Sequence, residues 1–136
     1  MGRLYRETPV ISIWEGSGNV MALDMMRAIS REPQAMQALL EDLAPFCRQD
    51  ARLSDAATAL VAGLRTQGEA TEWLARRHAQ LLVLLVQARL LGEHAPAAVA
   101  DAFIASRFDA QWGRVFGMLP DGVAHAAILD LSLIHI

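Results

Sequence analysis

The stretch from residue 69 to residue 92 most constrains the fold, because its centre is apolar on nearly every side. It contains the unbroken apolar run LLVLLV, residues 81–86. A helix that is apolar all round has to be covered all round by other elements. The run is well short of the roughly 18 apolar residues that a membrane span needs. We therefore expect residues 69–92 to form the central helix of a bundle. Its centre should contain Leu81, Leu82, Leu85 and Val86.

Most of the remaining chain also carries helical signals. Apolar residues recur at three- and four-residue spacing, which is typical of helices with one buried face. Pro33 and Pro96 suit the start of a helix, and Gly68 suits a helix end. The expected helices cover about residues 19–31, 33–46, 54–65, 69–92, 96–108 and 123–130. The sequence thus predicts an all-α fold, an up-down bundle of five to six helices over residues 19–130.

The two ends of the chain differ from this pattern. Pro9 biases Thr8 toward extended geometry, and VISIW is β-branched and apolar, so residues 1–18 are expected to be an extended lead-in and a turn. The last six residues, LSLIHI (131–136), place four large aliphatic side chains at a terminus, where sequences are usually polar. The same residues result from translating the end of a common transposase sequencing adapter. We expect them to be a non-native read-through tail.

Composition narrows the class of protein. The chain has 136 residues, 54% of them apolar and 20% charged, which suits one domain with a buried core. A net charge of -3 gives no reason to expect a polyanionic partner. The lone Cys47 excludes an internal disulfide and fits a reducing compartment, so we expect a cytoplasmic protein without a membrane partner.

The histidines give no sign of a metal site. His78, His94 and His125 lie on separate elements without Cys, Asp or Glu at ligand spacing. We expect them at the surface or partly packed.

One short stretch, WEGSGN (residues 14–19), combines groups that favour chemistry. Glu15 stands between an indole, Trp14, and a turn rich in backbone N–H groups that opens a helix. Such a turn suits an anionic ligand, and an indole supplies an apolar wall that makes a carboxylate more basic. A simpler interpretation is a glycine-rich turn that starts a helix, with the acid near the helix dipole. A dinucleotide fingerprint is disfavoured, because the third glycine and a βαβ unit are missing.

The motif also carries a family resemblance. The segment RLYRETPVISIWEGSGNVMALDMMRA resembles the part of acyl-CoA dehydrogenases that holds the catalytic glutamate, and most resembles their alkylation-response (AidB-type) branch. That branch has the pattern RLYRE-x-PV-x-SIWEGSGN followed by M-x-LD-x-x-RA. Ile11 and Gly2 stand where the branch usually has Asn and Pro. A weaker likeness continues through LLVQARLL, APAAVADAFIASRF and FGMLPDGV, so nearly the whole chain resembles the family's C-terminal end.

This resemblance implies a function. Glu15 would be the base that removes the α-proton of an acyl-CoA thioester while a hydride passes to FAD. The residues that it places at the cofactor or acyl pocket are Trp14, Gly16, Ser17, Gly18 and Asn19. Family members form tetramers through their C-terminal helices, which would cover the apolar central helix. The family's N-terminal helical region and middle β-domain would precede Met1. We therefore expect a C-terminal fragment that is inactive on its own.

The alternative is a non-catalytic helical module that binds a partner protein or DNA. The AidB-type branch is associated with DNA binding by its C-terminal region, and Arg65, Arg76, Arg77 and Arg89 are candidate contacts. Glu72 lies at the i,i+4 spacing of an ordinary helix pair with Arg76, which weakens this interpretation.

The aromatic residues are expected in the core and not at a ligand, since aromatic side chains at helical spacing usually bury themselves. They are Trp73, Phe103, Trp112 and Phe116.

Overall fold

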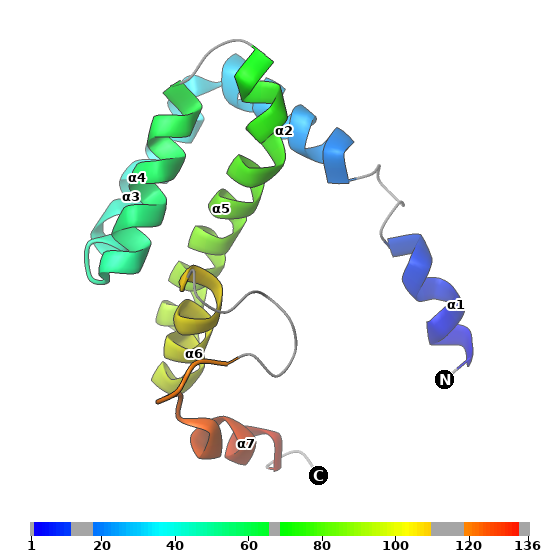
Figure 1. Ribbon diagram of the computed structural model, residues 1–136, viewed down its shortest axis with the longest axis vertical. Helices are drawn as coiled ribbons and strands as arrows, with labels where there is room; N and C mark the ends of the chain where they lie inside the picture. Colours follow the sequence, from blue (N-terminus) through cyan, green and yellow to red (C-terminus); the bar gives the residue numbers. More distant parts are fainter. Residues whose placement is uncertain (1, 12–17, 66–68, 110–118, 134–136) are drawn as a thin grey trace.

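The computed structural model describes residues 2–11, 18–65, 69–109 and 119–133, and within these ranges the chain forms seven α-helices and no strand (Figure 1). The helices are α1 (Gly2–Ile11), α2 (Gly18–Arg31), α3 (Pro33–Cys47), α4 (Ala51–Arg65), α5 (Glu69–His94), α6 (Ala97–Phe108) and α7 (His125–Leu133). The predicted all-α bundle is confirmed. None of the described helices combines the length and apolar character that a bilayer crossing requires.

Helix α5 is the central helix, as expected. It packs against α2, α3, α4 and α6, and Figure 1 shows it running the length of the bundle. Leu85 is only 1% exposed, and Leu81, Leu82 and Val86 pack against the same core, partly buried. The buried core consists of Met36, Leu43, Cys47, Leu53, Leu60, Leu85, Ala88 and Ile104. Burial of this apolar surface is the main favourable term in folding.

The described helices of one chain do not cover α5 all round. Val83 is 51% exposed and Leu90 is 49% exposed. With their exposed neighbours at three- and four-residue spacing they form one stripe along the helix, which we call the α5 open face. It consists of Trp73, Arg76, Gln80, Val83, Gln87, Leu90 and His94. All seven residues are exposed, and at one end of the face Arg76 also lies against Gly18 of α2.

Most helix ends follow the local signals in the sequence, and α4 shows where a signal was missed. It begins at Ala51, earlier than the predicted residue 54. Asp50 explains the earlier start, because its carboxylate accepts the backbone N–H of Arg52 at 2.8 Å and so caps the first turn. The Arg52 guanidinium also bonds this carboxylate at 2.7 Å. These hydrogen bonds, first among them that of the Arg52 side chain, lower the pKa of Asp50.

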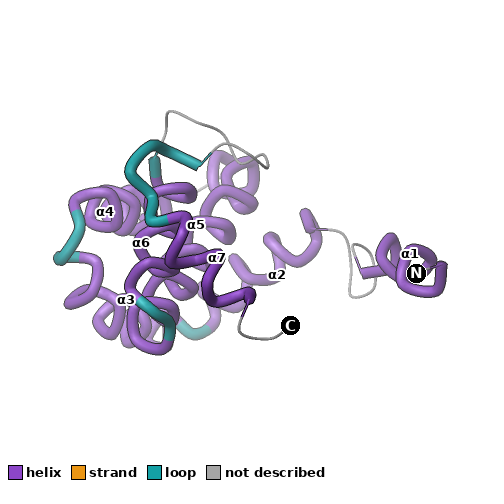
Figure 2. Tube along the Cα trace, turned by 90° about the horizontal axis from the view of Figure 1, so that it is seen from below, coloured by secondary structure: helices purple, strands orange, loops and turns teal. Residues whose placement is uncertain are grey.

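The predicted extended lead-in is wrong for residues 2–11, which form α1. An extended segment without a partner strand leaves its backbone groups unpaired within the chain, whereas a helix pairs them internally. Pro9 lies in the last turn of α1, so its missing N–H removes a hydrogen bond only near the helix end. Figure 2 shows α1 standing apart from the bundle, and it packs against no other described helix.

The C-terminal helix α7 packs against α6. Of the predicted read-through tail, residues 131–133 continue α7, and residues 134–136 lie outside the described ranges.

Leu85 and Leu90 give a matched test of this core, since both lie on α5 and differ in exposure. Leu85→Ala should lower the free energy of unfolding by about 2–5 kcal/mol, because it leaves a cavity in the packed interior. Leu90→Ala should change it by less than about 1 kcal/mol. Urea denaturation followed by circular dichroism measures both values. Equal losses would contradict the assignment of the α5 open face.

Candidate functional site

The sequence places the candidate site at the start of α2. Trp14, Glu15, Gly16 and Ser17 lie outside the described residues. The other two predicted cofactor-binding residues open the helix: Gly18 is its first residue and Asn19 follows. The structure therefore describes the site from Gly18, the first residue of α2, onward.

At this helix start, α2 lies against Arg76 of α5. A Cβ atom added to Gly18 would stand 2.6 Å from Nη2 of Arg76, so the glycine lets the guanidinium approach the backbone closely. The start of a helix carries partial positive charge from its unpaired N–H groups. The guanidinium adds a full positive charge beside it. The sequence predicted that the start of α2 favours an anion. Arg76 adds a second source of positive potential there.

A cavity of about 390 Å³ lies between α2 and α5 next to this contact, and we call it the α2–α5 cavity. Its lining residues are Asn19, Ala22, Leu23, Trp73, Ala75 and Arg76. The volume is within the range of about 300–1,000 Å³ typical of small-molecule sites. An indole, an amide and a guanidinium can bind a planar or anionic group, but none of them is a base at neutral pH. The described lining residues therefore include no general base.

Trp73 corrects one prediction. Its side chain is 86% exposed and lines the α2–α5 cavity, so it is not a core residue. Phe103 does pack against the core, partly buried, as expected. Trp112 and Phe116 lie outside the described residues. The spacing of apolar residues in the sequence does not show that Trp73 is exposed, because Trp73 and the core leucines share one helix that is apolar on several faces.

The involvement of Arg76 was also missed. The sequence suggested an i,i+4 pair or a DNA contact for this residue, whereas the structure places it against Gly18. Nothing local in the sequence signals this contact, because it depends on how α2 and α5 pack.

His78 is the second correction, because it is buried and not at the surface. It is 3% exposed, and its imidazole packs on Gly63 of α4 so closely that any side chain at that position would collide with it. Among the described residues its Nδ1 atom has no hydrogen-bond partner. Burial, and to a lesser extent the positive charge of Arg77, lower the pKa of His78. His94 and His125 are exposed, as expected. In the described ranges no three of His, Cys, Asp and Glu gather as metal ligands would.

The candidate DNA-contacting arginines do not form one free cationic face. Arg89 pairs with Glu93 and with Asp42, whose Oδ2 lies 3.3 Å from Nε of the arginine. Arg65, Arg76 and Arg77 are exposed, but Arg76 lies against Gly18. Nucleic-acid affinity rests on clustered uncompensated cations, so the structure adds little support to a DNA-binding interpretation.

The comparison with known proteins agrees with the motif. The chain is 34% identical over 111 residues to a curated protein of Escherichia coli (strain K12) named "Putative acyl-CoA dehydrogenase AidB". The resemblance to AidB is confirmed. The match covers 82% of the chain and 20% of AidB, so the chain spans about a fifth of that protein's length. No family model matches the chain, and no solved structure matches it significantly.

The buried imidazole of His78 predicts a pH dependence of stability. A histidine with a folded pKa below its unfolded value of about 6.5 binds more protons when unfolded, so stability falls as the pH drops below that value. The free energy of unfolding should be level above pH 7 and should decrease from about pH 6.5 downward, by at most about 1.4 kcal/mol per pH unit.

Urea denaturation between pH 7.5 and 5.5 measures this slope. His78→Gln should flatten it, whereas His94→Gln, at an exposed position on the same helix, should leave it unchanged. An unchanged slope in His78→Gln would show that other groups cause the pH dependence.

Proposed function

We propose that this chain is the C-terminal helical part of an FAD-dependent acyl-CoA dehydrogenase of the AidB-type branch, with Glu15 as the base that removes the substrate's α-proton. The observation that carries this proposal is the similarity to AidB over 111 residues, together with the WEGSGN motif that leads into α2. The lone cysteine, which fits a reducing compartment, supports a cytoplasmic location.

The chemistry of the motif suits this reaction. The α-proton of a thioester is weakly acidic, so its removal needs a strong base held within reach. A carboxylate that is desolvated against an apolar ring is more basic than one in water. Glu15 adjoins Trp14 in the sequence, which provides such a ring. FAD, when bound, accepts the hydride from the β-carbon of the substrate.

The described residues fit an anionic, aromatic cofactor. Gly18 and Arg76 provide positive potential for a phosphate group at the start of α2. Asn19 can hydrogen-bond polar atoms at the edge of the cavity, and the exposed indole of Trp73 offers an apolar face. These groups would bind and orient the cofactor, and the substrate's α-proton would move to Glu15.

The rest of such a site has to come from outside the described structure. Val20 and Met21, in the first turn of α2, are exposed together with Trp73. Uncovered apolar surface beside a binding cavity is typical of a surface that packs against another part of a protein. The length of AidB beyond the matched fifth is one source of that cover. Further copies of the chain, in a tetramer, would cover the α5 open face.

Replacing Glu15 in the full-length protein tests the assigned base. Glu15→Gln preserves the size of the side chain and removes the base, so flavin should stay bound while α-proton abstraction falls by a factor of about 10² or more. Flavin absorbance measures retention, and single-turnover reduction of the flavin by an acyl-CoA measures the rate. Asp24→Asn, which removes an exposed carboxylate from α2, is the control and should keep the wild-type rate. A wild-type rate in Glu15→Gln would contradict the proposal.

The isolated chain should behave differently from the full-length protein. Tight cofactor binding needs a pocket that buries most of the ligand, and the described lining of the α2–α5 cavity comes from two helices. Purified chain should therefore be colourless and should not reduce an electron acceptor with any acyl-CoA. Absorbance spectra and titration with FAD check this. A saturable sub-micromolar affinity would show that the chain holds a complete flavin site.

A further inference from the structure

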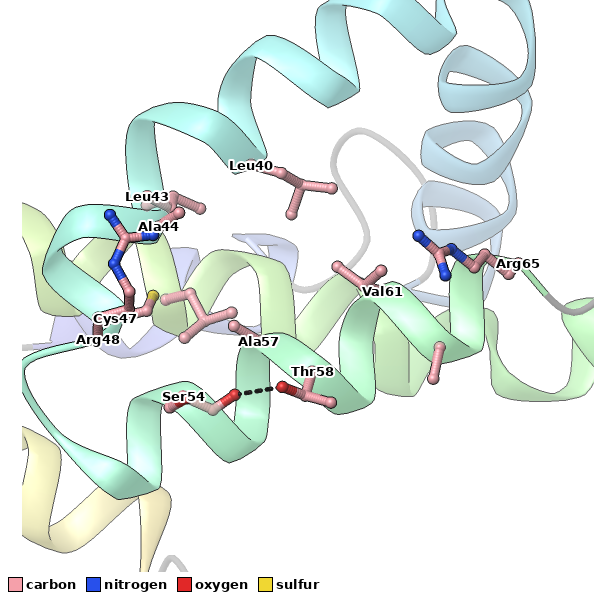
Figure 3. A pocket seen from close by; sticks show the side chains of 12 residues that line it. Leu40, Leu43, Ala44, Cys47, Arg48, Ser54, Ala57, Thr58, Val61 and Arg65 are labelled. Carbon is pink, nitrogen blue, oxygen red and sulfur yellow. Dashed lines mark hydrogen bonds between the residues drawn. The ribbon is translucent and has the colours of Figure 1, made fainter.

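A second cavity lies between α3 and α4, on another part of the bundle, and we call it the α3–α4 groove. It has a volume of about 340 Å³, and twelve residues line it, most of them apolar (Figure 3). Among the described residues it shares no lining residue with the α2–α5 cavity. A ligand in this groove would therefore leave the cavity at the start of α2 free.

The groove is long and its walls are largely hydrocarbon. Its α4 wall runs from Ser54 to Arg65, about 16 Å at the 1.5 Å rise of a helix. Leu40 and Val61 face it from the two helices, and the buried Leu85 of α5 also lines it. The hydroxyl of Thr58 donates to the backbone carbonyl of Ser54 at 2.9 Å, so it is already paired within its own helix. The groove therefore suits a linear apolar chain.

Each end of the groove carries a positive charge. Figure 3 shows Arg48 and Arg65 at opposite ends, and none of the twelve lining residues is acidic. In the described part of the chain neither guanidinium has an ion-pair partner. Arg52 and Arg89, in contrast, are both paired with carboxylates. The two unpaired arginines favour a ligand with an anionic group at one end of its apolar part.

The width of the groove decides between a small amphiphile and a peptide. Helices α3 and α4 contact each other, and the axes of packed helices are typically about 8–10 Å apart. A docked helix, itself about 10–12 Å across, does not fit between them. A single hydrocarbon chain does.

We propose that the α3–α4 groove binds one linear fatty acid, with its hydrocarbon chain along α4 and its carboxylate against Arg48 or Arg65. The carboxylate would accept charge-assisted hydrogen bonds from the guanidinium. The hydrocarbon would cover Val61 and the other apolar lining residues. The proposal does not rest on the flavin chemistry, because it involves neither Glu15 nor α2.

Isothermal titration calorimetry of the 136-residue chain with three amphiphiles of equal length tests the proposal: dodecanoate and dodecylammonium, each below its micelle concentration, and dodecanol below its solubility limit. Dodecanoate should bind saturably, one per chain, and at least about tenfold more tightly than dodecanol, because only it pairs with an arginine. Dodecylammonium should bind most weakly. The absence of saturable dodecanoate binding, or equal affinities for all three, would overturn the proposal.

Variants locate the site. Ala57→Phe fills the groove and should abolish binding, whereas Ala59→Phe, on the exposed face of the same helix, should bind as the wild type does. The double variant Arg48→Gln, Arg65→Gln should reduce dodecanoate affinity to that for dodecanol. The double variant Arg27→Gln, Arg31→Gln, at exposed positions on α2, is the matched charge control and should have no effect.

Ala57 packs partly against the core, so the melting temperature of each variant is measured first. If Ala57→Phe does not fold, Ala62→Phe fills the same groove from an exposed position. Wild-type dodecanoate affinity in a folded groove-filling variant would overturn the location. Wild-type affinity in the Arg48 and Arg65 double variant would overturn the role of the charges. The assay contains no flavin or acyl-CoA. A negative result would therefore contradict the fatty-acid site and leave the proposed dehydrogenase function unaffected.

Discussion

The packing of other helices on α5 determines the rest of the structure. Leu85 and Ala88 are almost completely buried where α5 meets its neighbours, and Leu60 of α4 is buried in the same core. Both cavities depend on this packing. Leu85 lines the α3–α4 groove, and Arg76 lines the α2–α5 cavity. One helix therefore joins the hydrophobic core to both cavities.

The sequence predicted the helices well where their ends depend on local chemistry. Pro33 begins α3, and α6 starts directly after Pro96. These residues act on the backbone next to them, whatever the rest of the fold does. Asp50 was missed as the cap of α4 although it is equally local. Residues 2–11 were assigned wrongly because Pro9 and the β-branched residues are weak evidence for extension when no partner strand is present.

The surroundings of individual side chains were less predictable, for a physical reason. A helix that is apolar on several faces has no clear periodicity to show which face is buried. Trp73 and Leu85 therefore look equally suited to the core in the sequence, and only packing exposes one and buries the other. His78 is buried because Gly63, on another helix, leaves space for its imidazole. Contacts between distant segments decide such cases, so the motif predicted a candidate base and an anion site but not the contact of Arg76 with Gly18.

The uncovered parts of α5 link assembly to the candidate cofactor site. Trp73 and Arg76 belong both to the α5 open face and to the lining of the α2–α5 cavity. A segment or second chain that covers this face along its whole length therefore also lies at the edge of the cavity. Such a neighbour would exclude water there, and electrostatic contacts strengthen when water is excluded. The attraction of Arg76 for an anionic group would then be strongest in the assembled protein. The uncovered α5 open face and the weak cofactor binding expected of the isolated chain would thus have the same physical cause, an interface that this segment cannot complete alone.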